Sequence, residues 1–243
     1  MDRDYALSYQ RLYREHWWWR ARERFILEVI DSLDFPADSH VLDVGCGGGW
    51  SFDALSRYGE VQGVELDASL VDLAGEHRTK IYCGAFDESF QPGHRFSLIL
   101  MLDVLEHLAD PIAALRHAIG LLEPGGKIVI TVPAFGMFWT SHDKINHHYV
   151  RYTKSSFGLI ATQASFDVQM QEYFFHWVAP LKLVVRLKEA MLGAVGKPPA
   201  VPPAPVNQMF IMLSRWEQRW MRRFRLPVGT SLMCVGGANQ TAV

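Results

Sequence analysis

The stretch VLDVGCGGGW at residues 41–50 decides the fold of this chain. A short apolar segment runs through Asp43 into a glycine-rich turn, and a second apolar segment ends in Glu65 about 20 residues later, a spacing typical of nucleotide-binding sheets. Glycines let the backbone approach a ligand closely, and a carboxylate at the tip of the next strand can accept hydrogen bonds from both ribose hydroxyls. The stretch therefore predicts an α/β sheet that holds a nucleoside.

The spacing of the glycines argues against a dinucleotide such as NAD. The dinucleotide fingerprint G-x-G-x-x-G uses its third glycine for close packing of helix on strand. Here Gly45 and Gly47 are followed by Trp50 at that third position. The turn therefore favours a different nucleoside cofactor.

Strands and helices are expected to alternate along the chain, which is typical of a parallel sheet with helical crossovers. The expected strands are residues 41–44, 61–65, 80–83, 96–102, 127–132, 167–174 and 230–235. The expected helices are residues 15–33, 50–58, 68–75 and 111–122, and a further helix that Thr153 caps and that ends at residue 164. We expect one domain, with residues 34–175 as its core and residues 228–243 as the final strand and tail.

A helical insert is expected at residues 176–227, between the last two strands. It contains two helical patterns separated by the proline-rich segment 198–205. In the second pattern, helical spacing places a set of apolar residues on one face: Met209, Leu213, Trp216, Trp220 and Phe224. The favoured prediction is that this stripe packs on the domain, and the alternative is a lid or a surface for an apolar acceptor.

Basic residues are concentrated from residue 181 onward, where only Glu189 and Glu217 oppose them. They are Lys182, Arg186, Lys188, Lys197, Arg215, Arg219, Arg222, Arg223 and Arg225. A solvated helix face is the favoured interpretation. The alternative is a basic amphipathic surface that meets a membrane or an anionic substrate, which leaves peripheral membrane contact open.

Composition indicates a globular protein of the cytoplasm. The chain has 243 residues, 49% of them hydrophobic, which predicts one domain with a sizeable core, and the net charge of −2 gives no indication of a nucleic-acid partner. The three cysteines have no metal-type spacing, so we expect reduced thiols. The charged N-terminus lacks the apolar region of a signal peptide, and no apolar run reaches the roughly 20 residues of a spanning helix.

Four motifs, in this order, resemble those of the class I S-adenosylmethionine-dependent methyltransferases: VLDVGCGGG, VQGVELD, FSLILMLDVLEHLADP and LLEPGGKIVITVP. The sequence looks most like the small-molecule group near the ubiquinone-biosynthesis O-methyltransferases, including the segment His16-Trp17-Trp18-Trp19 with Arg20 and Arg22. After Pro133 the chain departs from those enzymes.

The resemblance implies a doubly wound, Rossmann-like, seven-stranded and mostly parallel sheet whose last strand is antiparallel. It also implies S-adenosylmethionine as the cofactor and methyl transfer to a small-molecule acceptor, with a hydroxyl oxygen expected. Two alternatives stay open: a non-catalytic S-adenosylmethionine-binding module, and a methyltransferase that acts on a lipid-linked or sugar acceptor. The insert adds the expectation of an amphiphilic or anionic acceptor. The oligomeric state is not predicted.

By resemblance, the cofactor-binding residues are expected to be Arg22, Asp43, Gly45, Cys46, Gly47, Glu65, Leu66, Ala85, Phe86 and Leu102. The glycines bring the backbone to the methionine portion, and Cys46 serves there as a small residue. Asp43 fixes the loop or meets the amino group through water. Arg22 holds the cofactor carboxylate, or else forms a surface salt bridge.

The remaining cofactor contacts concern the nucleoside. Glu65 is expected to hold the ribose, Leu66 to pack on the adenine and Leu102 to close the pocket. Ala85 and Phe86 occupy the adenine side, where many relatives have an acid. Asp87 is the candidate to supply that contact.

The candidate catalytic residues are His107 and His148. Methyl transfer is an in-line displacement that mainly needs alignment, and a hydroxyl nucleophile is further helped by a base such as histidine. His107 follows Glu106 just after the fourth strand, where ligands bind in such sheets, or it only shapes that turn. His148 lies with His142 and His147 in the loop after the fifth strand, and the sequence does not decide which is the base. His16 is expected to cap or flank a helix.

A metal site is a further possibility at these residues. Asp103, Glu106 and His107 have the acid-x-x-Glu-His pattern that related ubiquinone and small-RNA methyltransferases use for magnesium, and two carboxylates suit a hard cation. The same pattern occurs in metal-free relatives. We predict no metal.

Overall fold

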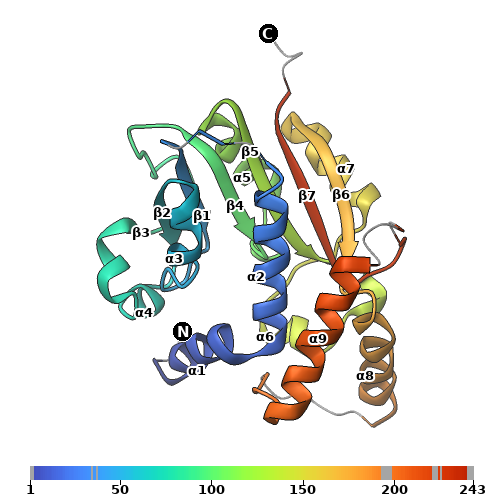
Figure 1. The fold of residues 1–243 in the computed structure, drawn as a ribbon. Coiled ribbons are helices and arrows are strands. Elements are labelled where there is room, and N and C mark those ends of the chain that lie inside the picture. Colours follow the sequence, from blue (N-terminus) through green and yellow to red (C-terminus); the bar gives the residue numbers. More distant parts are fainter. Residues whose placement is uncertain are drawn as a thin grey trace.

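The computed structural model describes residues 3–33, 35–36, 38–192, 199–220, 224 and 226–239. Its centre is a seven-stranded sheet in the order β3-β2-β1-β4-β5-β7-β6 (Figure 1). The strands are β1 His40–Val44, β2 Glu60–Glu65, β3 Ile81–Cys83, β4 Phe96–Leu102, β5 Leu122–Pro133, β6 Phe166–Phe174 and β7 Ser231–Ala238. Only β7 runs antiparallel to its neighbours. The predicted fold class is confirmed.

Helices cover both faces of the sheet, which explains why the central strands are continuous apolar runs. In β4, every residue from Phe96 to Met101 is buried. One face packs against α5 (Pro111–Gly120) and α7 (Lys154–Ala164), and the other against α2 (Trp17–Ile30) and α3 (Phe52–Leu55). The short helices α4 (Ala68–Val71) and α6 (Ser141–Ile145) complete the connections.

The N-terminal region forms two helices, where the sequence predicted one from residue 15. The additional helix is α1, Arg3–Glu15, which is mostly polar; among its residues 8–15, whose burial the structure describes, Leu12 is the one in the core. His16 separates the two helices and caps α2, because its Nδ1 accepts a hydrogen bond of 3.1 Å from the backbone N–H of Trp18. The capping role expected of His16 is confirmed.

The segment between β6 and β7 contains α8 (Val178–Leu192) and α9 (Ala204–Trp220). The prediction that the apolar stripe of the second helix packs on the domain is wrong, since Met209, Leu213, Trp216 and Trp220 are all exposed. The residues that α9 buries are instead Ile211, Ser214, Glu217 and Gln218.

Polar contacts explain which face of α9 turns inward. Gln218 donates to the backbone oxygen of Ala21 at 2.8 Å, and Asn207 accepts from the N–H of Trp17 at 2.8 Å. The first N–H groups of a helix have no partner within the helix, so Asn207 satisfies a donor of Trp17 that an apolar face would leave unpaired, and Gln218 adds a second polar contact to α2. Lys197, Arg222, Arg223 and Arg225 lie outside the described residues. No helix in the described ranges is both long and apolar enough to cross a membrane.

Candidate active site

The glycine turn and Glu65 meet at the carboxyl edge of the sheet. Gly45 and Gly47 have positive φ angles of 72° and 58°, in the left-handed region that favours glycine. A Cβ on Gly45 would lie 2.9 Å from the side chain of Val104, so close packing also requires glycine here. The N–H of Gly47 donates to Glu65 Oε2 at 2.8 Å, so the turn after β1 is tied to the tip of β2.

Two backbone N–H groups orient the Glu65 carboxylate. Besides the bond from Gly47, Oε1 accepts from the N–H of Asp67 at 2.9 Å. Each carboxylate oxygen can accept more than one hydrogen bond, so both retain capacity for a ligand hydroxyl. Leu66 beside it is 73% exposed and free to cover a flat aromatic ligand.

Asp43 and Cys46 are buried beneath the glycine turn and pack against it from the core. Asp43 is buried and accepts a 2.5 Å hydrogen bond from the hydroxyl of Ser51, and burial raises the pKa of Asp43 to about 6. The thiol of Cys46 points into the core, where a Cβ on Gly63 would lie 2.4 Å from its sulfur. Any contact of Cys46 with a ligand is therefore made by its backbone.

The residues after β3 lie at the next strand tip. Gly84 donates its N–H to the backbone oxygen of Glu65 at 2.9 Å, which brings Ala85 beside the Glu65 strand end. Ala85 is exposed, whereas the ring of Phe86 packs edge-on against His117 at 4.8 Å. The carboxylate of Asp87 accepts two hydrogen bonds from Ser89 and stabilises the local turn.

Arg22 forms a buried ion pair, so the alternative of a surface salt bridge is wrong. Its Nη2 lies 2.8 Å from Asp103 Oδ2 and donates to the hydroxyl of Thr131 at 3.0 Å. Thr131 donates in turn to Asp103 Oδ1 at 3.1 Å. Within the described residues, Arg22 Nε is buried without a partner and can donate to a ligand. Leu102, just before Asp103, is half-buried against the core.

An aromatic cluster that sequence reasoning missed covers the glycine turn. A Cβ on Gly48 would lie 2.7 Å from Trp50 Nε1, so the indole lies directly over the turn. The rings of Tyr9 and Tyr13 in α1 approach Trp50 at 6.4 and 5.7 Å. The spacing of four residues between the two tyrosines was the available signal, because it places both on one helix face.

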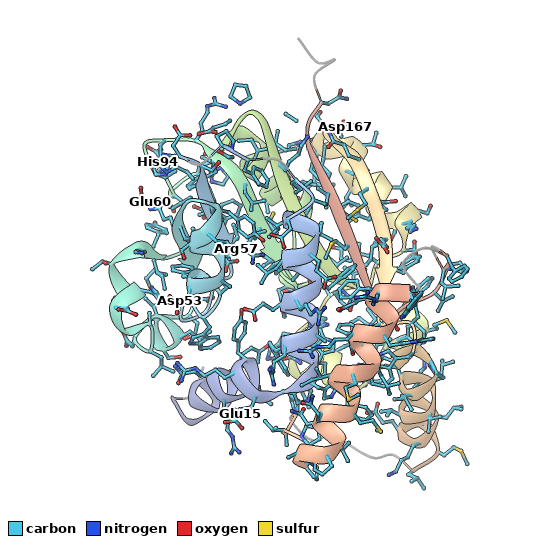
Figure 2. All side chains as sticks on the ribbon, in the orientation of Figure 1. Glu15, Asp53, Arg57, Glu60, His94 and Asp167 are labelled. Carbon is cyan, nitrogen blue, oxygen red and sulfur yellow. The ribbon has the colours of Figure 1, made fainter. Side chains whose placement is uncertain are left out.

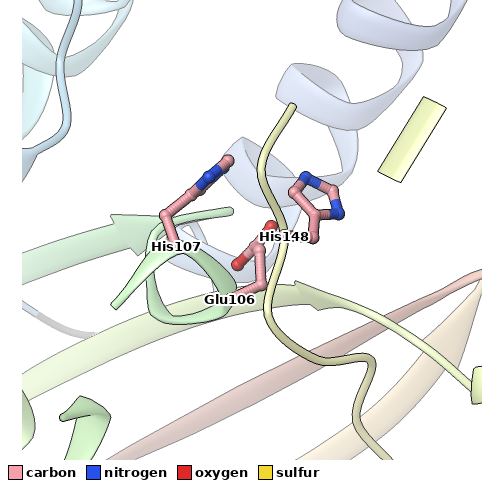
Figure 3. Close-up of side chains that lie close together, drawn as sticks. All are labelled: Glu106, His107 and His148. Carbon is pink, nitrogen blue, oxygen red and sulfur yellow. The ribbon is translucent and has the colours of Figure 1, made fainter. Parts of the chain in front are cut away.

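The two candidate catalytic histidines come together although they belong to separate segments (Figure 3). The ring centres of His107 and His148 are 4.7 Å apart. His148 Nδ1 lies 3.0 Å from Asp143 Oδ1, and Arg151 Nε donates to the same oxygen at 2.7 Å. Burial alone would raise the pKa of Asp143. Hydrogen bonds from His148 and Arg151 nevertheless hold this pKa well below its usual range. Asp143 thus remains a carboxylate that orients His148.

The other histidines of this region differ in setting. Burial lowers the pKa of His107, and the neighbouring His148 lowers it further, so the neutral imidazole is favoured. Burial also lowers the pKa of His142 to about 4, with a contribution from Lys182 of α8. His147 is exposed and has a positive φ of 56°.

Glu106 lies between these groups as a fully buried acid. Burial and the nearby Asp103 raise the pKa of Glu106 well above its usual value, and among the described residues neither carboxylate oxygen has a hydrogen-bond partner. Ligand atoms of Glu106, His107 and His148 lie within 4.8 Å of one another, close enough to share a cation. Both oxygens of Asp103 already bond Arg22 and Thr131. The absence of a metal stays a prediction.

Comparisons with known proteins agree with this geometry. A family model described as a methyltransferase domain matches residues 18–171. A ubiquinone biosynthesis O-methyltransferase from Coxiella burnetii is 36% identical over 109 residues, which cover 42% of this chain and 47% of that protein. One from Xanthomonas axonopodis pv. citri is 30% identical over 148 residues, covering 53% and 62%. The chain thus spans about half the length of these curated relatives.

A solved structure provides the third comparison. Phosphoethanolamine N-methyltransferase 2 from Haemonchus contortus, in complex with phosphomonomethylethanolamine and S-adenosylhomocysteine, has a TM-score of 0.63 to this chain. The match covers 99% of this chain and 59% of that one, at 15% identity. At this identity the likeness shows the fold alone.

Proposed function

Because the chain belongs to the methyltransferase-domain family, we propose that it transfers a methyl group from S-adenosylmethionine to a hydroxyl oxygen of a small molecule. The observation that carries the proposal is the meeting, at one sheet edge, of the Gly47–Glu65 contact and the His148–Asp143 pair. The similarity to ubiquinone biosynthesis O-methyltransferases supports oxygen as the methylated atom.

The residues at the edge of the sheet fit S-adenosylmethionine. The Glu65 carboxylate retains acceptor capacity for ribose hydroxyls, and Leu66 offers an exposed apolar surface for the adenine. Arg22 Nε is a buried, unpartnered donor suited to a carboxylate. Asp43 acts indirectly, through Ser51, by holding the turn. When bound, the sulfonium of this cofactor supplies an already activated methyl group.

His148 is the proposed general base for the acceptor hydroxyl. Its Nδ1 is engaged by the Asp143 carboxylate, so the proton on that nitrogen is held and Nε2 is left as the acceptor atom. His107, with its neutral ring favoured, is the proposed hydrogen-bond partner of the acceptor. Alignment of the hydroxyl with the methyl group and exclusion of water supply the rest of the rate enhancement.

Methyl-donor turnover on a panel of phenols, sugars and lipids tests the proposal, with calorimetry of S-adenosylhomocysteine as the binding control. We expect binding of S-adenosylhomocysteine in the micromolar range, which corresponds to about −8 kcal/mol, and turnover on at least one hydroxyl acceptor. Binding without turnover on any acceptor would support the alternative of a non-catalytic binding module. Turnover on amines but not on hydroxyls would overturn the oxygen assignment.

A lipid-linked or otherwise amphiphilic acceptor is the favoured class within this proposal. The loop that carries His148 is held by α8, whose outer side chains are largely apolar. An acceptor with a polar reactive ring and an apolar tail would find matching surfaces there. A preference for long-tailed over short-tailed phenols in the same panel is the expected result.

A further inference from the structure

Helix α8 is oriented with its apolar side outward. Its exposed residues include Leu181, Val184, Val185, Leu187, Met191 and Leu192. Leu187, Met191 and Leu192 are 61%, 80% and 68% exposed. A surface helix of a water-soluble domain normally turns its apolar side to the core. Water alone is therefore an unfavourable environment for this helix.

Two charged residues of α8, Arg186 and Glu189, bond to the rest of the domain and fix this orientation. Glu189 accepts hydrogen bonds from the N–H and the hydroxyl of Ser141, at 2.9 and 2.6 Å. Arg186 donates to the backbone oxygens of Gly136 and Met137. Turning the apolar side inward would break these contacts, so the exposure follows from the fold.

Helix α9 has three distinct sides. Its buried side contains Ser214, Glu217 and Gln218 and contacts α2 and the start of α8. Its second side exposes a continuous apolar set, Val206, Met209, Met212, Leu213, Trp216 and Trp220. At 100° per residue, Arg215 and Arg219 fall between this apolar set and the buried face, so they flank the apolar set along one edge. Tryptophans flanked by arginines are typical of helices that lie in a membrane interface.

The exposed charge of the two helices is positive. Lys188, Arg215 and Arg219 are exposed, whereas Glu189 and Glu217 are partly or fully buried and bond within the protein. The two helices meet at Trp177, whose ring lies 5.1 Å from that of Phe210 and whose N–H donates to Glu217. Both project beyond the carboxyl ends of the strands, on the side of the proposed active site (Figure 1). Figure 2 shows many side chains extending from them away from the sheet.

We infer that the apolar and basic surface of α8 and α9 docks on an anionic phospholipid bilayer, with the apolar side chains at the boundary between headgroups and acyl chains. The inference rests on exposure and charge and does not require the proposed methyl transfer. A second copy of the chain fits less well, because a two-fold contact on this surface would bring the same arginines together. The basic residues instead complement anionic headgroups.

Co-sedimentation with vesicles tests the inference. Vesicles of phosphatidylcholine alone are compared with vesicles that also contain phosphatidylglycerol, each at low and at high salt. We expect binding to the anionic vesicles at low salt and a several-fold loss at high salt, since salt screens exposed charges. Failure to bind anionic vesicles at low salt would overturn the inference.

Two variants and a matched control distinguish the contribution of this surface to vesicle binding from a general effect of added negative charge. Leu187→Glu, combined with Met191→Glu, places charge on the exposed side of α8 and should reduce vesicle binding at least tenfold. Arg215→Glu with Arg219→Glu should remove the preference for anionic lipid. Leu159→Glu is the control, because Leu159 is 64% exposed on α7 and lies outside this surface.

Binding of S-adenosylhomocysteine should be unchanged in all three variants, so a failed methyl-transfer assay would not be mistaken for a failed membrane test. Retention of vesicle binding by Leu187→Glu with Met191→Glu, or its equal loss in Leu159→Glu, would contradict the assignment. Sedimentation velocity without lipid provides the last check. A dimer that dissociates in the α8 variant would make the surface a contact between copies and overturn the membrane assignment.

Discussion

Glu189 of α8 accepts both hydrogen bonds that Ser141 can donate, from its backbone N–H to Oε2 at 2.9 Å and from its hydroxyl to Oε1 at 2.6 Å. Ser141 begins the short helix α6, which contains Asp143, the partner of His148. The segment between β6 and β7 is therefore joined by two contacts to the loop that carries the proposed base. We therefore expect a substitution of Glu189 to alter the position of His148 relative to the acceptor hydroxyl.

The contact between Glu189 and Ser141 gives a first prediction. Glu189→Ala should reduce kcat/KM roughly tenfold, because two hydrogen bonds worth about 1 kcal/mol each, or more with a charged partner, no longer hold α6. Affinity for S-adenosylhomocysteine should not change, and Glu189→Gln should restore part of the activity. Lys188→Ala, at the adjacent exposed position, is the control in assays without membranes. Equal activity of the alanine variant and the parent protein would show that the contact has no role in turnover.

Glu65 is predicted to dominate cofactor affinity. Glu65→Ala should weaken binding of S-adenosylhomocysteine roughly 10- to 100-fold, since an unsatisfied buried polar group costs about 1–3 kcal/mol. The change also frees the N–H groups of Gly47 and Asp67. Isothermal titration calorimetry measures the difference. Glu60→Ala is the matched control, because Glu60 begins the same strand at the opposite end of the sheet (Figure 2). Normal binding by Glu65→Ala would mean that the pocket lies elsewhere.

The proposed base leads to a third prediction. His148→Asn should lower kcat roughly 100- to 10,000-fold, the range for loss of a general base, with little change in S-adenosylhomocysteine binding. The matched control is His147→Asn, since His147 is exposed and asparagine tolerates its positive φ of 56°. If the two variants have equal kcat, His148 is not the base.

The burial of His16 leads to the prediction that the free energy of unfolding depends on pH. Burial lowers the pKa of His16 to about 4, whereas an unfolded histidine titrates near 6.5. Between these values the unfolded chain binds the proton and the folded protein does not, so stability falls as the pH drops from 6.5 towards 4. The loss is on the order of 3 kcal/mol, at about 1.4 kcal/mol per pKa unit.

Urea unfolding at pH 7 and pH 4.5 measures this contribution. His16→Asn preserves a capping side chain without a titrating group, so its unfolding free energy should depend less on pH than that of the parent protein. An identical pH dependence in the two proteins would assign the effect to other groups.

The last prediction concerns metal. Turnover should persist after treatment with EDTA, because hard divalent cations prefer several oxygen ligands and the cluster of Glu106, His107 and His148 offers a single carboxylate. The Asp103 carboxylate is already bonded to Arg22 and Thr131. Activity that EDTA abolishes and Mg²⁺ restores would contradict this prediction.

Local signals determined most of the sheet. Positive-φ turns demand glycine, so the run at residues 45–49 located the end of β1, and continuous apolar runs located β4 and β5 because both sheet faces are covered. The expected bounds of β4 agree with the structure, whereas β5 begins five residues earlier than expected, at Leu122 rather than Lys127. The helix α1 was missed because most of its residues are polar, although the spacing of Tyr9 and Tyr13 at four residues was a helical signal.

The sequence by itself determined the fold class, the glycine turn and the carboxylate at Glu65, because these depend on residues adjacent in the chain or on strands whose ends share one edge. Only the tertiary structure paired Arg22 with Asp103, selected Asp143 as the partner of His148, and exposed the apolar side of α9. Helical periodicity identifies the faces of a helix but not the groups opposite each face. On α9 the hydrogen bonds of Gln218 to the backbone oxygen of Ala21 and of Glu217 to the N–H of Trp177 hold the polar face inward, and the apolar face was left at the surface.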